Sequence, residues 1–305
     1  MQTKTKAYIA FAATGILWGS TWEASKIGVG TLPGLQFSAI RQCIAGLLII
    51  GYFMAKGQPL PTRRQFVFLA GMGFFTFFLS NGVSTWGLNY ISGGMAALIA
   101  AMYPLFVVLI EIIFFKKNIA RPATFLGLAM GIGGIVLVFY ENAIHQNTPH
   151  YWKGILLCLI ATLGWSVGTI LLAGNTLQIH RQYALGWQMF SASFFIGFLA
   201  FVTGNHIPFH QITLTSWCAM AYLVVAGSIL AFKAFLYTME HLTPSVAALY
   251  AYINPIVALL IGAALLNDAL TFTNIVGSLI TLAGVYIVNR SVQVHTMTIA
   301  DAEGM

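Results

Sequence analysis

Charged residues are scarce in this chain. Only 7% of its 305 residues are Asp, Glu, Lys or Arg, whereas 59% are hydrophobic, and the mean hydropathy is +0.84. A soluble domain of this length needs a more charged surface, so the composition indicates a membrane protein with several spans. The 14 basic residues outnumber the 7 acidic ones, but they lie singly or in pairs between apolar runs. Such scattered charges argue against a nucleic-acid partner.

Signatures of catalysis and of metal binding are also lacking. The three cysteines, Cys43, Cys158 and Cys218, share no CxxC or metal-ligand spacing and are interpreted as small apolar fillers. His206 and His210 are separated by a proline that spoils helical i, i+4 ligation. The sequence contains no nucleotide-binding or hydrolase motif. We therefore expect no cofactor, no metal and no enzymatic activity.

Apolar runs of about 20 residues predict ten transmembrane helices in an all-α protein. The first run continues through Trp18 and Trp22 and is interpreted as a retained helix rather than a signal peptide. The predicted spans are Ala7–Gly28, Leu35–Met54, Phe66–Trp86, Gly93–Phe115, Ala123–Tyr140, Trp152–Ala173, Tyr183–Thr203, Leu214–Met239, Pro244–Leu266 and Phe272–Asn289. Residues 292–305 are predicted to form a polar, disordered tail.

One stretch occurs twice. Residues 96–104, AALIAAMYP, recur loosely as residues 247–255, AALYAYINP. Each copy places a proline inside a predicted helix, which leaves the carbonyl four residues earlier, at Ala100 or Ala251, without its usual donor. A bilayer tolerates such a freed carbonyl only where protein or a wet cavity satisfies it. Two breaks at matching places therefore predict one central cavity.

The repeat also predicts the topology. Residues 1–145 and 146–291 each contain five predicted helices, an odd number, so the second half must enter the membrane inverted. Inverted repeats are typical of secondary transporters, whose substrate site lies near the midplane between the halves. The positive-inside rule places both termini in the cytoplasm, because ten basic residues then fall inside and only Lys26 and Lys153 outside. The ten are Lys4, Lys6, Lys56, Arg63, Arg64, Lys116, Lys117, Arg121, Arg181 and Arg290.

Several landmarks resemble a known family. Leu17-Trp18-Gly19-Ser20 with Lys26, then Leu32-Pro33 and the stretch from Phe37 to Arg41, is similar to the opening of the EamA family of the drug/metabolite transporter superfamily. Tyr103-Pro104 and Asn254-Pro255 resemble its later landmarks, so the resemblance runs from about Ala7 to Asn289. Asp268 follows the ninth predicted helix, where the family often has an acidic residue, but Lys117 follows the fourth. The resemblance implies a ten-helix carrier, commonly an exporter of amino acids or related metabolites from a bacterial cytoplasm.

Four ionisable residues fall inside the predicted spans and are candidates for function, because charge is costly there. Arg41 could hold a substrate carboxylate or form a structural pair. Glu23 could exchange a proton, or be neutralised by Arg41 or by Lys26 on its own helix. Lys233 could face the cavity or snorkel toward the cytoplasm. Glu111, closer to the inner face, is a weaker candidate.

Polar and aromatic residues complete the predicted substrate site. Tyr103 and Asn254 adjoin the two prolines and are predicted to donate and accept hydrogen bonds at midplane depth. Trp18 and Trp165, at repeat-related positions, are predicted aromatic walls, although packing explains tryptophan equally well. The predicted substrate-binding set is Arg41, Tyr103, Asn254, Trp18, Trp165, Lys233, Tyr252 and Asn81, with Glu23 for proton coupling.

These features predict a secondary active transporter that exports an amino acid or a related metabolite by alternating access. Uptake of a sugar or a nucleoside is an alternative. A membrane-embedded lipid-modifying enzyme would need clustered catalytic groups, yet Glu23 and Glu111 lie near opposite faces. A receptor without transport would leave the paired prolines unexplained. The expected partners are the lipid bilayer and a small-molecule substrate. The chain is expected as a monomer or weak homodimer, with the pairs Gly15/Gly19 and Gly127/Gly131 packing helices within one copy.

Overall fold

The computed structural model describes residues 3–115, 122–145, 150–173, 179–242, 250–268 and 270–303. These residues form helices and connections, with no strand among them. Seven helical stretches are long and apolar enough to cross a membrane. They are Gly34–Ala55, Arg63–Gly87, Gly93–Ile113, Tyr151–Leu171, Arg181–Val202, Leu214–His241 and Phe272–Ser291. Pro122–Val138 and Tyr250–Leu265 are shorter apolar helices. The all-helical membrane fold is confirmed, while the number of ten spans stays a prediction.

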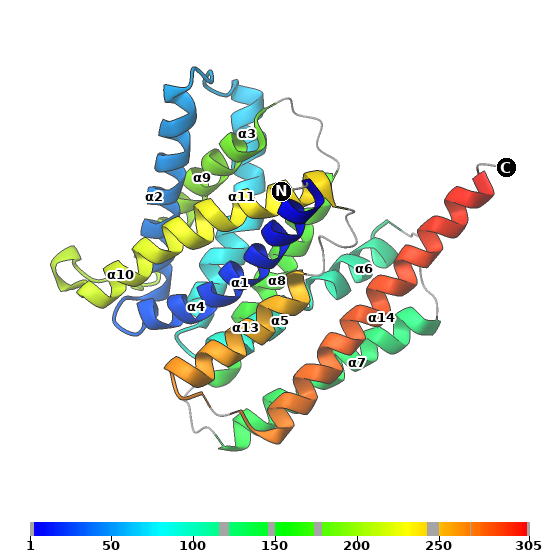
Figure 1. Cartoon of the computed structure of the whole chain (residues 1–305). Coiled ribbons are helices and arrows are strands. Elements are labelled where there is room, and N and C mark those ends of the chain that lie inside the picture. Colours follow the sequence, from blue (N-terminus) through cyan, green and yellow to red (C-terminus); the bar gives the residue numbers. More distant parts are fainter. Residues whose placement is uncertain are drawn as a thin grey trace.

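Figure 1 gives the order of the elements. The first half contains α1 (Thr3–Val29), α2 (Gly34–Ala55), α3 (Arg63–Gly73), the π-helix η1 (Phe74–Gly82), α4 (Val83–Gly87), α5 (Gly93–Ala100), α6 (Tyr103–Ile113) and α7 (Pro122–His145). The second half contains α8 (Tyr151–Ala173), α9 (Arg181–Val202), the 3-10 turn η2 (Phe209–Gln211), α10 (Leu214–Tyr222), the π-helix η3 (Leu223–Leu230), α11 (Ala231–His241), α13 (Tyr250–Leu265) and α14 (Phe272–Glu303).

The two prolines act differently on their helices. Pro104 lies at the first turn of α6, after a break at residues 101–102 that ends α5. Pro255 lies inside α13, which continues through it. The predicted start of the ninth span, residues 243–249, lies outside the described residues, as do Lys116, Lys117 and Arg121. The expectation of a disordered tail is wrong for residues 292–303, because α14 continues to Glu303 with no proline or glycine to end it earlier.

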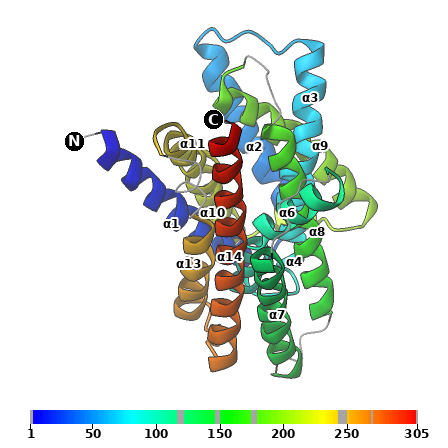
Figure 2. The ribbon, with the colours of Figure 1, turned by 90° about the vertical axis from the view of Figure 1, so that its right-hand side faces the viewer.

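Contacts between helices follow a paired pattern. α7 and α14 lie side by side along their length (Figures 1 and 2), and α2 packs along α9. α1 packs against α13 and against α10, η3 and α11. In the same way, α8 packs against α5 and α6 and against η1 and α4. The helices thus form one bundle in which α1 and α8 have equivalent neighbours.

One end of this bundle is tightly bonded. We call it the α1–α2 end; it contains the connections at residues 30–33, 88–92, 203–213 and 266–271. There Lys26 Nζ donates to the Leu88 carbonyl at 2.6 Å, and Ser216 Oγ donates to the Gly28 carbonyl at 2.8 Å. Gln36 exchanges two hydrogen bonds with the backbone of Ile207. The opposite end, with the α2–α3 connection at residues 56–62, is called the α2–α3 end.

Small residues allow the closest helix approach. A methyl group at Gly19 of α1 would lie 2.5 Å from Val257 Cβ and 2.9 Å from the Asn254 carbonyl oxygen of α13. Gly15, one turn earlier, meets Ile253 in the same way. The pair Gly15/Gly19 therefore packs two helices of one chain, and Gly127 likewise meets the backbone of Gly284 in α14.

Gly19→Val should destabilise the protein by about 1–3 kcal/mol, because the added carbons meet α13 backbone and cannot be accommodated by a rotamer change. The measurement is thermal unfolding in detergent together with the monodisperse yield. Gly133→Ala is the control, since a methyl group there meets nothing within 4 Å. It should raise stability slightly, through helix propensity. Equal unfolding temperatures for the two variants would contradict this account of the α1–α13 contact.

Candidate functional site

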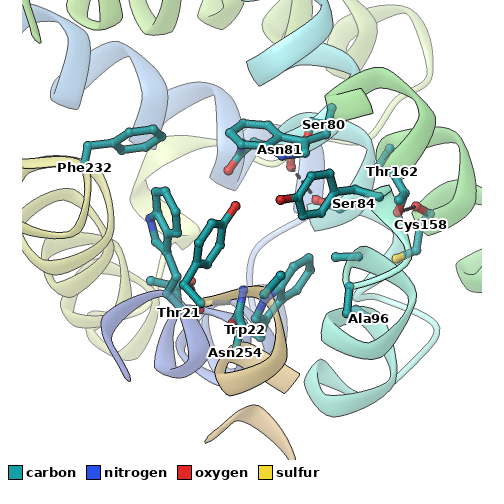
Figure 3. A pocket seen from close by; sticks show the side chains of 18 of the residues that line it. Thr21, Trp22, Ser80, Asn81, Ser84, Ala96, Cys158, Thr162, Phe232 and Asn254 are labelled. Atoms are coloured by element: carbon teal, nitrogen blue, oxygen red, sulfur yellow. Dashed lines mark hydrogen bonds between the residues drawn. The ribbon is translucent and has the colours of Figure 1, made fainter. Parts of the chain in front are cut away.

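A cavity of about 130 Å³ lies in the middle of the bundle. Figure 3 shows side chains from α1, η1, α4, α5, α8, α11 and α13 surrounding it. The residues that line it are Trp18, Thr21, Trp22, Arg41, Ser80, Asn81, Ser84, Ala96, Ala100, Ala101, Tyr103, Cys158, Ala161, Thr162, Trp165, Phe232, Tyr250, Ala251 and Asn254. Both stretches that precede the prolines contribute, which is the arrangement expected from the repeat.

The two π-helices shape the cavity. η1 supplies Ser80 and Asn81 to its wall. η3 supplies the Gly227 carbonyl, which accepts a hydrogen bond from Trp18 Nε1 at 3.2 Å, and Ser228, which lies beside Arg41. A π segment widens a helix turn and displaces its side chains, and such segments are frequent at functional sites. Local backbone geometry, in both halves of the chain, therefore positions the polar groups.

Arg41 is the only ionisable side chain of Asp, Glu, Lys, Arg or His type among the described residues that line this cavity. It is 7% exposed, and its Nη2 is 3.4 Å from Ser228 Oγ. Its Nε has no hydrogen-bond partner among the described residues. A buried cation without a counter-charge is costly. The site is therefore prepared for an anionic group.

Hydrogen-bond acceptors lie in another part of the cavity wall. Asn254 Oδ1 is buried and has no hydrogen bond to a described residue. Ala100 and Ala251 also line the cavity. Their carbonyls lack the usual helical donor, because the residues four positions later, Pro104 and Pro255, have no backbone N–H. Asn254 and these carbonyls can accept hydrogen bonds from a donor such as an ammonium group. The cavity thus offers a cation and a set of neutral acceptors.

Aromatic rings form a further part of the wall. Trp18 lies 5.0 Å from the rings of both Phe232 and Tyr250, each in an edge-to-face arrangement. The side chains of Tyr250 and Tyr103, which occupy opposite halves of the repeat, lie close enough to interact. These rings hold each other in place, so they provide a preformed apolar surface beside Arg41.

Six of the eight predicted substrate-binding residues line this cavity: Arg41, Tyr103, Asn254, Trp18, Trp165 and Asn81. The structure does not bring Lys233 or Tyr252 there. Lys233 is exposed and close enough to act electrostatically on Tyr52, as a snorkelling lysine would. Tyr252 accepts a hydrogen bond of 2.7 Å from Asn289 Nδ2. Glu111 does not line the cavity either.

Glu23 lies outside the cavity, at the α1–α2 end. Its charged neighbours are Asp268 and Lys26, not Arg41. Helical periodicity explains the separation, because Glu23 follows Trp22 by one residue and so points about 100° away from it around α1. Of the two partners considered for Glu23, the structure brings Lys26 near its carboxyl group and does not bring Arg41 there.

Sequence reasoning missed several cavity residues. Trp22 lies one helical turn after Trp18, so the i, i+4 spacing could have revealed it. Ser80, Ser84 and Thr162 are small polar residues without a distinctive pattern, and their placement depends on η1 and on packing. Cys158, interpreted as a filler, is indeed buried but also lines the cavity.

Comparison with known proteins gives the class. The model of the EamA-like transporter family matches residues 5–140 and again residues 152–290. The uncharacterized inner membrane transporter YedA of Escherichia coli K12 is 29% identical over 263 residues, covering 86% of this chain and 83% of YedA. The uncharacterized transporter sll0355 of Synechocystis is 26% identical, covering 95% and 92% of the two chains. A solved crystal structure with 19% identity superposes with a TM-score of 0.61 over 93% of this chain and supports the fold alone.

Apolar helices long enough to span a bilayer, packed around a central polar cavity, define a multi-pass membrane protein. The family match covers nearly the whole chain, and the chain belongs to the EamA-like transporter family. This makes it a membrane transporter, and the inner-membrane location in the name of YedA belongs to that relative.

Arg41→Met distinguishes a binding cation from a structural one. Because Arg41 has no ion pair with a described residue, its removal should leave stability unchanged or raise it by up to about 2 kcal/mol. Thermal unfolding in detergent is the measurement. Arg290→Met, on the exposed face of α14, is the matched control and should change little. Unfolding of the Arg41 variant, with the control intact, would show that the guanidinium is needed to hold the fold.

Proposed function

We propose that this protein is a secondary active transporter that exports a small amphipathic carboxylate, most simply an amino acid. The observation that carries the proposal is Arg41, a buried cation in the central cavity without a charged partner among the described residues. A substrate carboxylate would supply that partner through charge-assisted hydrogen bonds. A neutral sugar or nucleoside would leave the buried charge uncompensated, so the site favours an anionic group.

The remaining wall fits the rest of such a substrate. Asn254 and the carbonyls of Ala100 and Ala251 can accept hydrogen bonds from an ammonium group. Trp18, Trp165 and Phe232 offer an apolar surface for a side chain. Tyr103 and Asn81 add groups that can bond to either end. A zwitterion with an apolar side chain uses all three parts of the cavity.

The transport cycle that we propose is alternating access between two inverted five-helix repeats, residues 1–145 and 146–291. The paired contacts support it, since α1 and α8 have equivalent neighbours on opposite sides of the cavity. Lys56, Arg63 and Arg64 lie at the α2–α3 end, which favours a cytoplasmic position for that end and for both termini. The tightly bonded α1–α2 end would then be the outer end, closed in this conformation.

We propose protons as the driving ion, with Glu23 as the coupling residue. Glu23 is 1% exposed, and neither carboxylate oxygen has a hydrogen bond to a described residue. A carboxyl group in such surroundings can gain and lose a proton as its exposure changes. Export driven by protons that enter from outside requires a group of this kind near the outer end.

The test is transport by purified protein in proteoliposomes loaded with a mixed pool of amino acids, sugars and nucleosides, read by mass spectrometry with and without a pH gradient. We expect amino acids to move, and to accumulate only with the gradient. Arg41→Ala should lower the apparent affinity roughly 10- to 100-fold, since a hydrogen bond to a charged group contributes about 1.5–3 kcal/mol. Glu23→Gln should abolish accumulation driven by the gradient.

Arg290→Ala and Lys153→Gln are controls for the loss of a basic residue, because neither side chain lines the cavity: Arg290 is exposed and Lys153 is partly exposed. Neither should change transport by more than about twofold. Transport of neutral sugars alone, or full activity in the Arg41 variant, would contradict the substrate class. Accumulation that ignores the gradient would contradict proton coupling but leave the carrier function standing.

A further inference from the structure

A second polar cluster lies at the α1–α2 end, apart from the cavity. It contains Glu23 and Lys26 of α1 and Asp268, which follows α13. Glycine backbone surrounds the Glu23 carboxylate: a side chain at Gly93 of α5 would collide with both of its oxygens, and the amide of Gly94 faces it. No described residue makes a hydrogen bond to either oxygen of the Glu23 carboxylate. Glu23 is thus a nearly fully buried carboxyl aimed into a cluster of charges.

The two carboxyl groups lie close together. A methyl group at Gly262 of α13 would be 2.8 Å from Asp268 Oδ2 and 3.0 Å from Glu23 Oε1. The two oxygens are therefore within about 6 Å of each other, a range at which like charges in a desolvated site oppose joint ionisation. Desolvation raises the pKa of Asp268, and the nearby Lys26 acts in the opposite direction.

The charges of the cluster do not balance when both carboxyl groups are ionised. Glu23 and Asp268 then contribute −2 and Lys26 contributes +1, which leaves one net negative charge around the buried Glu23 carboxylate. Lys26 cannot move away freely, because its Nζ donates to the Leu88 carbonyl at 2.6 Å. Tyr151 of α8 also faces Asp268, while Gly93 of α5 and Gly262 of α13 lie against the Glu23 carboxylate. One added proton makes the cluster neutral.

The cluster also joins α1, the end of α4 and the connection that follows α13. Glu23 and Lys26 belong to α1, and Lys26 is bonded to the end of α4. Asp268 belongs to the connection between α13 and α14. When the α1–α2 end opens, water reaches the carboxyl groups and the penalty for the unbalanced charge disappears. Closure and proton binding should therefore favour each other.

We propose that Glu23, Asp268 and Lys26 form a proton-binding gate, in which one proton shared by the two carboxyl groups holds the α1–α2 end closed. The proposal extends the transport cycle proposed above by adding Asp268 as the partner of Glu23 and Lys26 as the residue that sets the number of protons. In this proposal the cluster has a net charge of zero while the α1–α2 end is closed. It loses its proton, and so reaches a net charge of −1, before that end opens.

The test measures opening directly and needs no substrate. Cys158 lines the cavity and is 2% exposed, so a membrane-impermeant maleimide added from outside reaches it only when the outer end opens. Cys43→Ser and Cys218→Ser leave Cys158 as the one thiol, and labelling is measured from pH 5.5 to 8.5 relative to the unfolded protein at the same pH. We expect labelling of this parent protein to accelerate as the pH rises, by up to tenfold per pH unit for one proton.

The variants have opposite expected results, which a merely structural role would not produce. In Glu23→Gln or Asp268→Asn, the remaining carboxylate balances Lys26 without a proton, so the end should stay closed and labelling slow at every pH. In Lys26→Gln the closed cluster needs two protons, so labelling should already be fast near pH 7. Lys153→Gln removes a partly exposed lysine of α8 that is not among the charged neighbours of Glu23 or Asp268; it is the matched control and should behave like the parent.

If Cys158 is labelled faster in both carboxyl variants than in the parent protein, the proposal is overturned. That result would show that the two carboxyl groups only seal the α1–α2 end. Flat labelling in the parent would also overturn it, even if transport is observed. Closure by Na⁺ at fixed pH, compared with choline, would replace the proton by a metal cation and overturn the assignment. If labelling follows the expected pattern but no solute in the mixed pool moves, the gate stands and the proposed substrate class falls.

Discussion

The need to satisfy every backbone polar group inside a bilayer governs this structure. Helices meet that need internally, so an irregular backbone is tolerated only against protein or around a wet cavity. Pro104 and Pro255 each remove a donor, and η1 and η3 each widen a helix turn. All four irregularities adjoin the same cavity. Its polar wall is therefore as much a property of backbone geometry as of side-chain chemistry, with carbonyls and the Gly227–Trp18 hydrogen bond contributing directly.

How far the sequence predicted this site depended on the kind of signal. The proline pair, the tryptophans and Arg41 stand out locally, and they do meet at the cavity. The sequence did not indicate the π-helices. Their segments, Phe74–Gly82 and Leu223–Leu230, differ in composition and share only their place in the repeat. Lys233 was misplaced because depth along a helix says nothing about which side of it a residue occupies. The partners considered for Glu23 were Arg41 and Lys26, and Asp268 was not among them, because it lies in a connection whose path depends on tertiary packing.

The two polar sites have complementary electrostatics. The central cavity contains an unbalanced cation, Arg41, whereas the cluster at the α1–α2 end contains two carboxyl groups and one lysine. The cavity has an excess of one positive charge, and the cluster has an excess of one negative charge when both of its carboxyl groups are ionised. An anionic group would neutralise the first and a proton the second. Since burying unbalanced charge is costly, the closed bundle should favour both additions without any direct contact between them.

The same helices connect these two sites. α1 presents Trp18 and Trp22 to the cavity and Glu23 and Lys26 to the cluster, within about two turns. α5 contributes Ala96 and Ala100 to one site and Gly93 to the other, and α13 contributes Asn254 and Gly262 in the same way. The close α1–α13 contact at Gly15 and Gly19 prevents these helices from adjusting independently. A rigid displacement of α1 with α13 would therefore change both sites at once, which is the physical requirement for coupling an ion to a substrate.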